Sequence, residues 1–330
     1  MTGGVSLAAL LAACGGDDSA GEVPAGTAAP GRTVQHMYGT TGIEGTPSRI
    51  LTVGLTDQDA VFALGFAPIA SQAWYADQVV YPWAESYSQA SGVATKIILP
   101  GELNTETVAA EDPDLIIAIS AGIDQGQYEL LSQIAPTIAG SADYDAWTTP
   151  WQVQTVMIGQ ALGREAQAQA LVAAAEQKFA EAAARHPEWQ GATAVLASQY
   201  IEGQLLVYAS SDPATKFLTD LGFTIATAID EHMNDTFGVP TLSAELFELI
   251  DVDLVLWDGY REALEDAGLF DVPTFAALDI VREGRNVFPS ASVADALSFR
   301  NVLSLPWALE QLEPQLVAAF DGDPATSAEA

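Results

Sequence analysis

Aromatic residues and two arginines stand where short apolar runs, typical of strands, come to an end. In chain order these residues are Trp74, Tyr75, Tyr208, Trp257, Arg261 and Arg300. Tyr and Trp offer flat apolar area with a polar handle, which suits a bulky, partly aromatic ligand. A guanidinium group pairs with an anion and stacks on aromatic faces. These residue types predict a binding site, although Trp257 fits a lobe core equally well and either arginine fits a solvated surface ion pair.

No motif in the sequence nominates a nucleophile, a general base or a metal site. The patterns GxxxxGKS, GxGxxG, HExxH and GxSxG are all missing. A single cysteine allows neither an internal disulfide nor a cysteine-cluster metal site, and His36, His186 and His232 are far apart in the sequence. Catalysis therefore has no positive support, and we expect neither a bound metal nor an intrinsic cofactor.

The composition limits the partners. Eleven Lys and Arg against 44 Asp and Glu give a formal net charge of -33, and such a surface repels phosphate backbones, so nucleic acid is not expected. A length of 330 residues with 49% hydrophobic content is enough for two domains with sizeable cores.

Strands and helices alternate along the chain. The apolar runs that predict strands are 50–53, 69–71, 115–119, 137–139, 194–197, 205–208, 254–257 and 287–289. Helical patterns between them favour parallel α/β sheets covered on both faces. From Pro150 to Arg185 almost nothing breaks a helix except Gly163, so helices are predicted over 151–162 and 164–185, closed by Pro187. The prediction is two α/β lobes joined by one long interdomain helix, with a ligand cleft between the lobes.

The N-terminus carries the pattern of a lipoprotein signal. Residues 5–13 form a short apolar run that ends in Leu-Ala-Ala before Cys14, and Gly-Gly-Asp-Asp follows. This resembles a bacterial lipobox, and two acyl chains on Cys14 would anchor the chain stably to a membrane. Residues 1–4 contain no Lys or Arg, which leaves open a start codon upstream of Met1.

The expected organisation follows from these elements. It comprises a signal peptide (1–13), a flexible tether (14–32), an N-terminal lobe (33–149), connecting helices (150–186), a C-terminal lobe (187–320) and a disordered tail (321–330).

Two glutamates occupy equivalent places in the two lobes. Glu106 follows Asn104-Thr105 and Glu245 follows Ser243-Ala244, and each triplet stands shortly before an acidic residue and a buried strand. Asn or Ser is expected to cap a helix of about two turns, where a carboxylate is stabilised by the helix dipole. The repetition indicates one acidic group per lobe on a face that docks a two-fold partner.

Several motifs together resemble a known family. They are PSRILTVG (47–54), DQDA (57–60), ALG (63–65), PDLII (113–117), LSQIAPT (131–137) and LSLPWAL (303–309). In order and spacing, over about residues 35–320, they resemble the iron–siderophore substrate-binding lipoproteins of ABC importers, a group that includes haem and cobalamin binders.

The resemblance implies a receptor outside the cytoplasm that binds a ferric siderophore at the lobe interface and delivers it to an ABC permease. It also implies that Glu106 and Glu245 pair with permease arginines. Pocket side chains vary within the group, so the six aromatic and arginine residues are expected to contact the ligand on the strength of their types and positions. We expect a monomer that performs no reaction. Three alternatives stay open: a haem or corrinoid ligand, with His232 or a tyrosine as axial haem ligand; a chelate-modifying extracellular enzyme; and a surface partner protein with a degenerate cleft.

Overall fold

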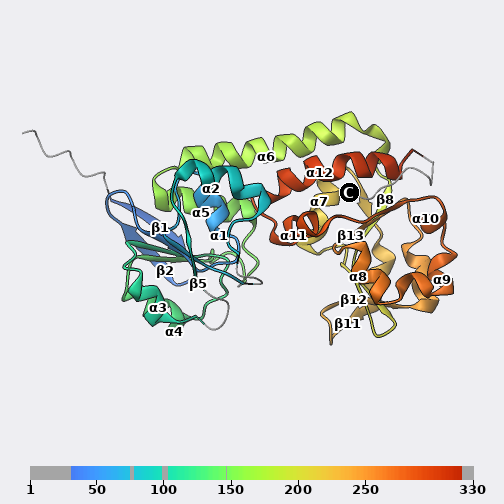
Figure 1. Cartoon of the computed structure of the whole chain (residues 1–330), viewed down its shortest axis with the longest axis horizontal. Helices are drawn as coiled ribbons and strands as arrows, with labels where there is room; N and C mark the ends of the chain where they lie inside the picture. The colour runs from blue at the N-terminus through green and yellow to red at the C-terminus, as the bar shows by residue number, and fades with distance from the viewer. Residues whose placement is uncertain (1–30, 75–77, 99–102, 146, 322–330) are drawn as a thin grey trace, which may run out of the picture.

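The computed structural model describes residues 31–74, 78–98, 103–145 and 147–321. Two α/β lobes lie side by side and are joined by helices along one side (Figure 1). Within the described residues, one lobe holds a five-stranded sheet and the other a seven-stranded sheet. The predicted α/β class and the two lobes are therefore confirmed. The proposed signal peptide with Cys14, most of the tether and the tail after Asp321 lie outside the described residues.

The N-terminal lobe is built on a parallel sheet with the strand order β5-β4-β3-β6-β7. Its strands are β3 (Ile50–Thr52), β4 (Ala70–Gln72), β5 (Lys96–Ile98), β6 (Leu115–Ala118) and β7 (Thr137–Ala139). Its helices are α1 (Asp57–Ala63), α2 (Glu85–Ser91), α3 (Thr105–Ala110) and α4 (Gln125–Ser132), with the 3-10 turn η1 (Pro82–Ala84). All residues of β3, β4, β6 and β7 are buried, as expected for parallel strands covered on both faces.

An antiparallel hairpin precedes this sheet and was not predicted. It consists of β1 (Arg32–His36) and β2 (Gly39–Ile43). The two strands contain few apolar residues, which is why no apolar run marks them. Buried and exposed residues alternate along both strands, and this alternation is the feature of the sequence that indicates them.

The connecting helices form where the sequence predicts them. Helix α5 (Trp151–Leu162) ends at Gly163, whose φ of 68° is in the left-handed region, and α6 (Glu165–Arg185) follows. Helix α6 runs along both lobes with α12 (Ser304–Ala319) beside it (Figure 1). Lys178 pairs with Glu310 at 2.6 Å and Arg185 with Glu313 at 2.8 Å, so exposed ion pairs also join the two helices.

The C-terminal lobe has a mixed sheet with the order β11-β12-β9-β8-β13-β14, and β10 pairs with β8. Its strands are β8 (Thr193–Ile201), β9 (Gln204–Val207), β10 (Thr224–Ile225), β11 (Met233–Asn234), β12 (Val239–Ser243), β13 (Leu254–Trp257) and β14 (Asn286–Val287). The α-helices are α7 (Lys216–Asp220), α8 (Arg261–Asp266), α9 (Pro273–Ala276), α10 (Asp279–Arg282), α11 (Ala291–Phe299) and α12. The 3-10 helices are η2 (Pro187–Trp189), η3 (Pro213–Thr215), η4 (Thr227–His232), η5 (Ala244–Ile250) and η6 (Leu269–Asp271).

The expectation of purely parallel sheets is wrong for this lobe. Strands β8 and β9 form an antiparallel hairpin, and β12 adds to β9 antiparallel as well. The turn places Glu202 at φ 52° and Gly203 at φ 79°, the two positive values that a tight two-residue hairpin turn requires.

The lobes share a structural repeat at the start of their central strands. Asp114, just before β6, accepts hydrogen bonds from the Ser48 and Arg49 backbone N–H groups at 2.8 and 2.9 Å. Asp253, just before β13, accepts hydrogen bonds from the Thr193 backbone N–H at 2.7 Å and from the Thr193 hydroxyl at 2.8 Å. These two hydrogen bonds lower the pKa of the Asp253 carboxyl. Each aspartate thus fixes its own strand against the neighbouring one, which explains the repeated acidic residue before both apolar runs.

The two lobes also share buried surface. One cluster of buried apolar side chains includes Leu115 of the first lobe, Ile158 of α5 and Leu196 and Leu256 of the second lobe. Two further clusters belong to one lobe each, around Trp257 in the second and Leu51 in the first. Because a shared apolar core resists separation, the lobes are packed together along their helical side.

Candidate functional site

The carboxyl ends of the parallel strands form a pocket in each lobe. In the first lobe a cavity of about 180 Å³ is lined by Val53, Gln72, Trp74, Leu103, Ala121, Gly122, Ile123 and Gln127. The Trp74 indole donates to the Val53 carbonyl at 3.0 Å and meets the Trp147 ring edge-on at 5.0 Å. Trp74 is partly exposed, so it offers a fixed apolar face at this strand edge, as predicted from its position after β4.

A buried carboxyl group organises this edge. Asp57, at the start of α1, accepts hydrogen bonds from the Ile119 and Ser120 backbone N–H groups and, at 2.7 Å, from the Gln154 amide of α5. Burial raises the pKa of Asp57, and these donors oppose the rise. Gly54 allows the arrangement, since an added Cβ would lie 2.1 Å from the Asp57 Oδ2.

A second buried carboxyl group connects the lobes. Asp59 of α1 accepts a hydrogen bond from the Trp83 indole and another from the Asn301 amide, both at 2.6 Å. Burial raises the pKa of Asp59 to about 7, against the effect of these two donors. Asn301 follows α11 of the other lobe, and the ring of Phe299 on that helix lies 5.6 Å from the ring of Trp83. Asp59 therefore joins the first lobe to the segment at the end of α11.

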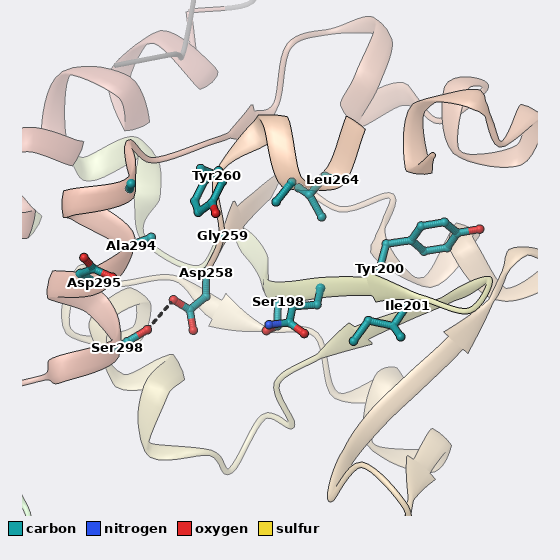
Figure 2. Close-up of a pocket in the computed structure, with 13 residues that line it drawn as sticks. Ser198, Tyr200, Ile201, Asp258, Gly259, Tyr260, Leu264, Ala294, Asp295 and Ser298 are labelled. Atoms are coloured by element: carbon teal, nitrogen blue, oxygen red, sulfur yellow. Dashed lines mark hydrogen bonds between the residues drawn. The ribbon is translucent and has the colours of Figure 1, made fainter. Parts of the chain in front are cut away.

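The strand-edge pocket of the second lobe has a volume of about 360 Å³, against about 180 Å³ for the pocket beside Trp74 (Figure 2). It is lined by Ser198, Gln199, Tyr200, Ile201, Asp258, Gly259, Tyr260, Ala263, Leu264, Ala291, Ala294, Asp295 and Ser298. Asp258 directly follows β13, and its carboxylate accepts hydrogen bonds from the Ser298 hydroxyl at 3.1 Å and from the Tyr208 hydroxyl. The pocket thus combines tyrosine rings, hydroxyl groups and two carboxylates at a strand edge.

The structure brings Tyr208 and Arg300 together beside this pocket. Burial and the Asp258 carboxylate raise the pKa of Tyr208, while the nearby Arg300 charge opposes that rise. Arg300 ends α11 at φ 43°, in the left-handed region, and directly precedes Asn301. Arg300 therefore lies where the pocket meets the lobe junction. A non-glycine residue with this φ is uncommon and is often held in place for a function.

Two predicted ligand residues lie elsewhere. Trp257 is 0% exposed, its ring stacks on Phe288 at 5.6 Å, and its indole donates to Asn286 at 2.9 Å. Assigning it to the ligand is wrong, because β13 is buried on both faces. Arg261 is absent from the residues that line the pocket; its guanidinium lies over the Phe270 ring at 4.8 Å and pairs with Glu265 at 2.7 Å. Its predicted role in ligand binding therefore stays a prediction.

Two other predicted residues cannot be placed, and three residues that line the second-lobe pocket were not predicted. Tyr75 and Cys14 lie outside the described residues. The sequence reasoning missed Asp258, Asp295 and Ser298; the available signal was a polar residue directly after a buried strand, which applies to Asp258.

Both predicted docking glutamates are exposed at the start of a helical segment. Glu106 is the second residue of α3, where the Asn104 side chain accepts from the Glu106 backbone N–H at 3.0 Å. Glu245 is the second residue of η5, a 3-10 helix whose preceding Ser243 makes no capping side-chain bond. The predicted cap is therefore confirmed only in the first lobe, and the docking role stays a prediction.

Within the described part of the chain, no group of three or more His, Cys, Asp and Glu side chains is placed to hold a metal ion. His36 is buried and contacts Thr41 at 2.9 Å, and His186 stacks on Trp189. His232 ends η4 and is not among the residues lining the second-lobe pocket. Among the same residues, no helix has the length and apolar character to cross a bilayer.

The profile of the periplasmic binding protein family matches residues 53–288 of the sequence, which include both lobes and the connecting helices. This chain belongs to the periplasmic binding protein family. Members of this family bind substrates for transport, and they act outside the cytoplasm.

Two relatives of this periplasmic binding protein are named for iron chelates. The probable siderophore-binding lipoprotein YfiY of Bacillus subtilis (strain 168) is 23% identical over 257 residues, 76% of each chain. The Fe(3+) dicitrate-binding periplasmic protein FecB of Escherichia coli (strain K12) is 26% identical over 213 residues, 64% of this chain and 68% of that protein.

Solved structures share the fold. A periplasmic solute binding protein from Mycobacterium smegmatis str. MC2 155 has a TM-score of 0.78 and 31% identity, covering 87% of this chain and 98% of that one. Streptococcus pneumoniae TIGR4 PiaA in complex with ferrichrome has a TM-score of 0.69 and 25% identity over the same shares. The similarity extends over nearly all of both chains.

Proposed function

We propose that this protein is the substrate-binding component of an ABC importer and that its ligand is a ferric siderophore. The observation that carries the proposal is the polar, tyrosine-bearing pocket at the strand edge of the second lobe, flanked by Arg300 at the lobe junction. Such a surface contacts the outside of a chelate through rings and hydroxyl groups. The names of the relatives, which include siderophore-, dicitrate- and ferrichrome-binding proteins, support the same ligand class.

The chelate, not the protein, supplies the iron ligands in this proposal. A bare metal ion needs several imidazole or carboxylate ligands that converge on one point. Asp258 and Asp295 are the two carboxylates of the second-lobe pocket, and Asp258 already accepts two hydrogen bonds. The iron is therefore cargo enclosed by its chelator, and the protein performs no reaction on it.

The cellular setting is part of the proposal. We place the protein at the outer face of the cell membrane, anchored through acylated Cys14, with residues 14–32 as the tether. The units 33–149, 150–186 and 187–320 act as lobe, connector and lobe, and the protein works as a monomer. Glu106 and Glu245, both exposed, provide one carboxylate per lobe for arginines on the permease.

Tryptophan fluorescence tests the ligand class directly. Ferric siderophores should quench the emission in a saturable way, and more strongly than haemin or cobalamin at equal concentration. Trp74→Phe should lose part of the quenching, while Trp189→Phe, which changes a fully buried ring, should keep it. Binding of haemin with a Soret band and none of ferric chelates would contradict the proposal, as would quenching by no compound at all.

A further inference from the structure

The second-lobe pocket carries negative charge and little to balance it. Asp258 and Asp295 both line it, and no Lys or Arg is among the residues that do so. Burial and the neighbouring Asp258 charge both raise the pKa of Asp295, so these two carboxylates already repel each other. An anion entering the pocket adds to that repulsion.

The positive charges of the chain are committed elsewhere. All eleven Lys and Arg of the sequence fall within the described residues. Seven of them pair with carboxylates, Arg32 and Arg49 donate to backbone carbonyls, and Arg164 lies over the Phe66 ring at 5.8 Å. Arg300 is the exception, since its guanidinium makes no hydrogen bond or ion pair with any described residue. Two pocket carboxylates therefore face one available guanidinium.

The first-lobe pocket does not supply the missing charge. Its lining consists of apolar residues, one glycine, Trp74 and the amides Gln72 and Gln127. These groups donate and accept hydrogen bonds but carry no formal charge. Lys96 lines a neighbouring cavity of the same lobe, but its ammonium group pairs with Glu111. Taken together, the two described pockets and Arg300 contribute two negative charges and one positive charge.

We propose that the ferric siderophore bound by this chain is a neutral or cationic trihydroxamate rather than a trianionic tris-catecholate. The inference rests on the proposed function and narrows its ligand. Three hydroxamates each carry one negative charge and neutralise Fe(III), whereas three catecholates leave three negative charges on the complex. Burying those charges beside Asp258 and Asp295 requires cations that this site does not provide.

The same residues fit the hydroxamate surface. Tyr260 and Ser298 offer hydroxyl groups at the pocket, and Arg300 offers a single cluster of donors for hydroxamate oxygens. Asp295 is exposed and lines the pocket (Figure 2), so a chelate with a protonated amine would also pair with it. The two carboxylates thereby disfavour trianionic tris-catecholate complexes and accept neutral or cationic trihydroxamate complexes.

The test compares ferrichrome, ferrioxamine B and ferric enterobactin by fluorescence titration of the full chain at low and high salt. The two trihydroxamate complexes should bind at least about tenfold more tightly than the tris-catecholate. Asp295→Asn should reduce that preference several-fold, mainly by improving ferric enterobactin binding. Asp266→Asn, an exposed change on the same lobe outside the pocket, should leave the preference unchanged.

The outcomes separate the two levels of the proposal. Tight binding of ferric enterobactin, with the trihydroxamates weaker, overturns this inference and leaves the siderophore function standing. Failure of all three ferric complexes to bind overturns the proposed function itself. A preference that Asp295→Asn does not change, in a variant with wild-type melting temperature, removes the pocket carboxylates as its cause.

Discussion

Replacing Asp59 by asparagine should abolish a pH dependence of stability that this one carboxyl group creates. Asp59 is 0% exposed, its Oδ2 accepts from Trp83 and Asn301, and its Oδ1 has no hydrogen-bond partner among the described residues. An uncharged carboxyl group tolerates this environment, but a carboxylate loses its hydration there. Asparagine keeps the acceptor that Trp83 and Asn301 need and removes the charge.

The direction and the size of this pH dependence follow from the raised pKa of Asp59. Burial shifts the pKa of Asp59 from 3.8 to about 7 in the folded chain. Between these values the folded chain holds a proton that the unfolded chain has lost, so the free energy of unfolding falls as pH rises and stays low above the window. A shift of this size corresponds to roughly 4 kcal/mol lost across the window. The pKa of Asp57 is also raised, so Asp57 too lowers the free energy of unfolding as pH rises. The effect of Asp59 is therefore measured as the difference in free energy of unfolding between wild type and Asp59→Asn.

Urea unfolding followed by circular dichroism at a series of pH values measures this difference. The stabilities of wild type and Asp59→Asn should nearly coincide near the lower end of the window and separate by a few kcal/mol above its upper end, with the variant more stable. Trp83→Phe removes one donor to the carboxylate and should move the upper end of the window to higher pH. Parallel curves for wild type and Asp59→Asn at all pH values would refute the reasoning.

Three further predictions concern residues with different roles. Trp257→Ala should lower the free energy of unfolding by about 3–5 kcal/mol, measured in urea, while Tyr260→Ala should leave stability nearly unchanged and weaken chelate binding; equal effects of both on stability would contradict the core assignment. Glu106→Gln combined with Glu245→Gln should preserve chelate affinity and abolish iron uptake by cells, and unchanged uptake would remove their docking role. Arg300→Gln should weaken an anionic chelate more than a neutral one, as measured by fluorescence titration; equal losses would contradict an electrostatic role.

The helical connector and four of the five first-lobe strands could be predicted because their signals are local, whereas β5, whose first two residues are exposed, was not predicted. Pro150 and Gly163 punctuate an otherwise uninterrupted helical composition, and the structure places the helix ends beside them. The antiparallel half of the second sheet could not be inferred in the same way, since β9 has the same apolar character as a parallel strand. Its direction is set by the two-residue turn at Glu202 and Gly203, a weaker signal than the apolar run itself.

The site was only partly predictable, because a buried parallel strand hides which way each side chain points. Trp257 ends an apolar run just as a rim residue would, but its indole finds Asn286 within the core. Arg261 follows the same strand and instead lies over Phe270, which is close to it only in the folded chain. Arg300 was predictable from its place in a loop, whereas its proximity to Tyr208 arises from the packing of α11 against the strand edge.

The central claim is that the chain binds an intact ferric chelate without transforming it. Gel filtration of the protein mixed with excess ferrichrome, followed by iron analysis of the protein peak and mass spectrometry of the released chelate, tests this most directly. The account predicts one iron per chain and a chelate of unchanged mass. Elution of the protein without iron, or release of a cleaved or iron-free chelate, would contradict it.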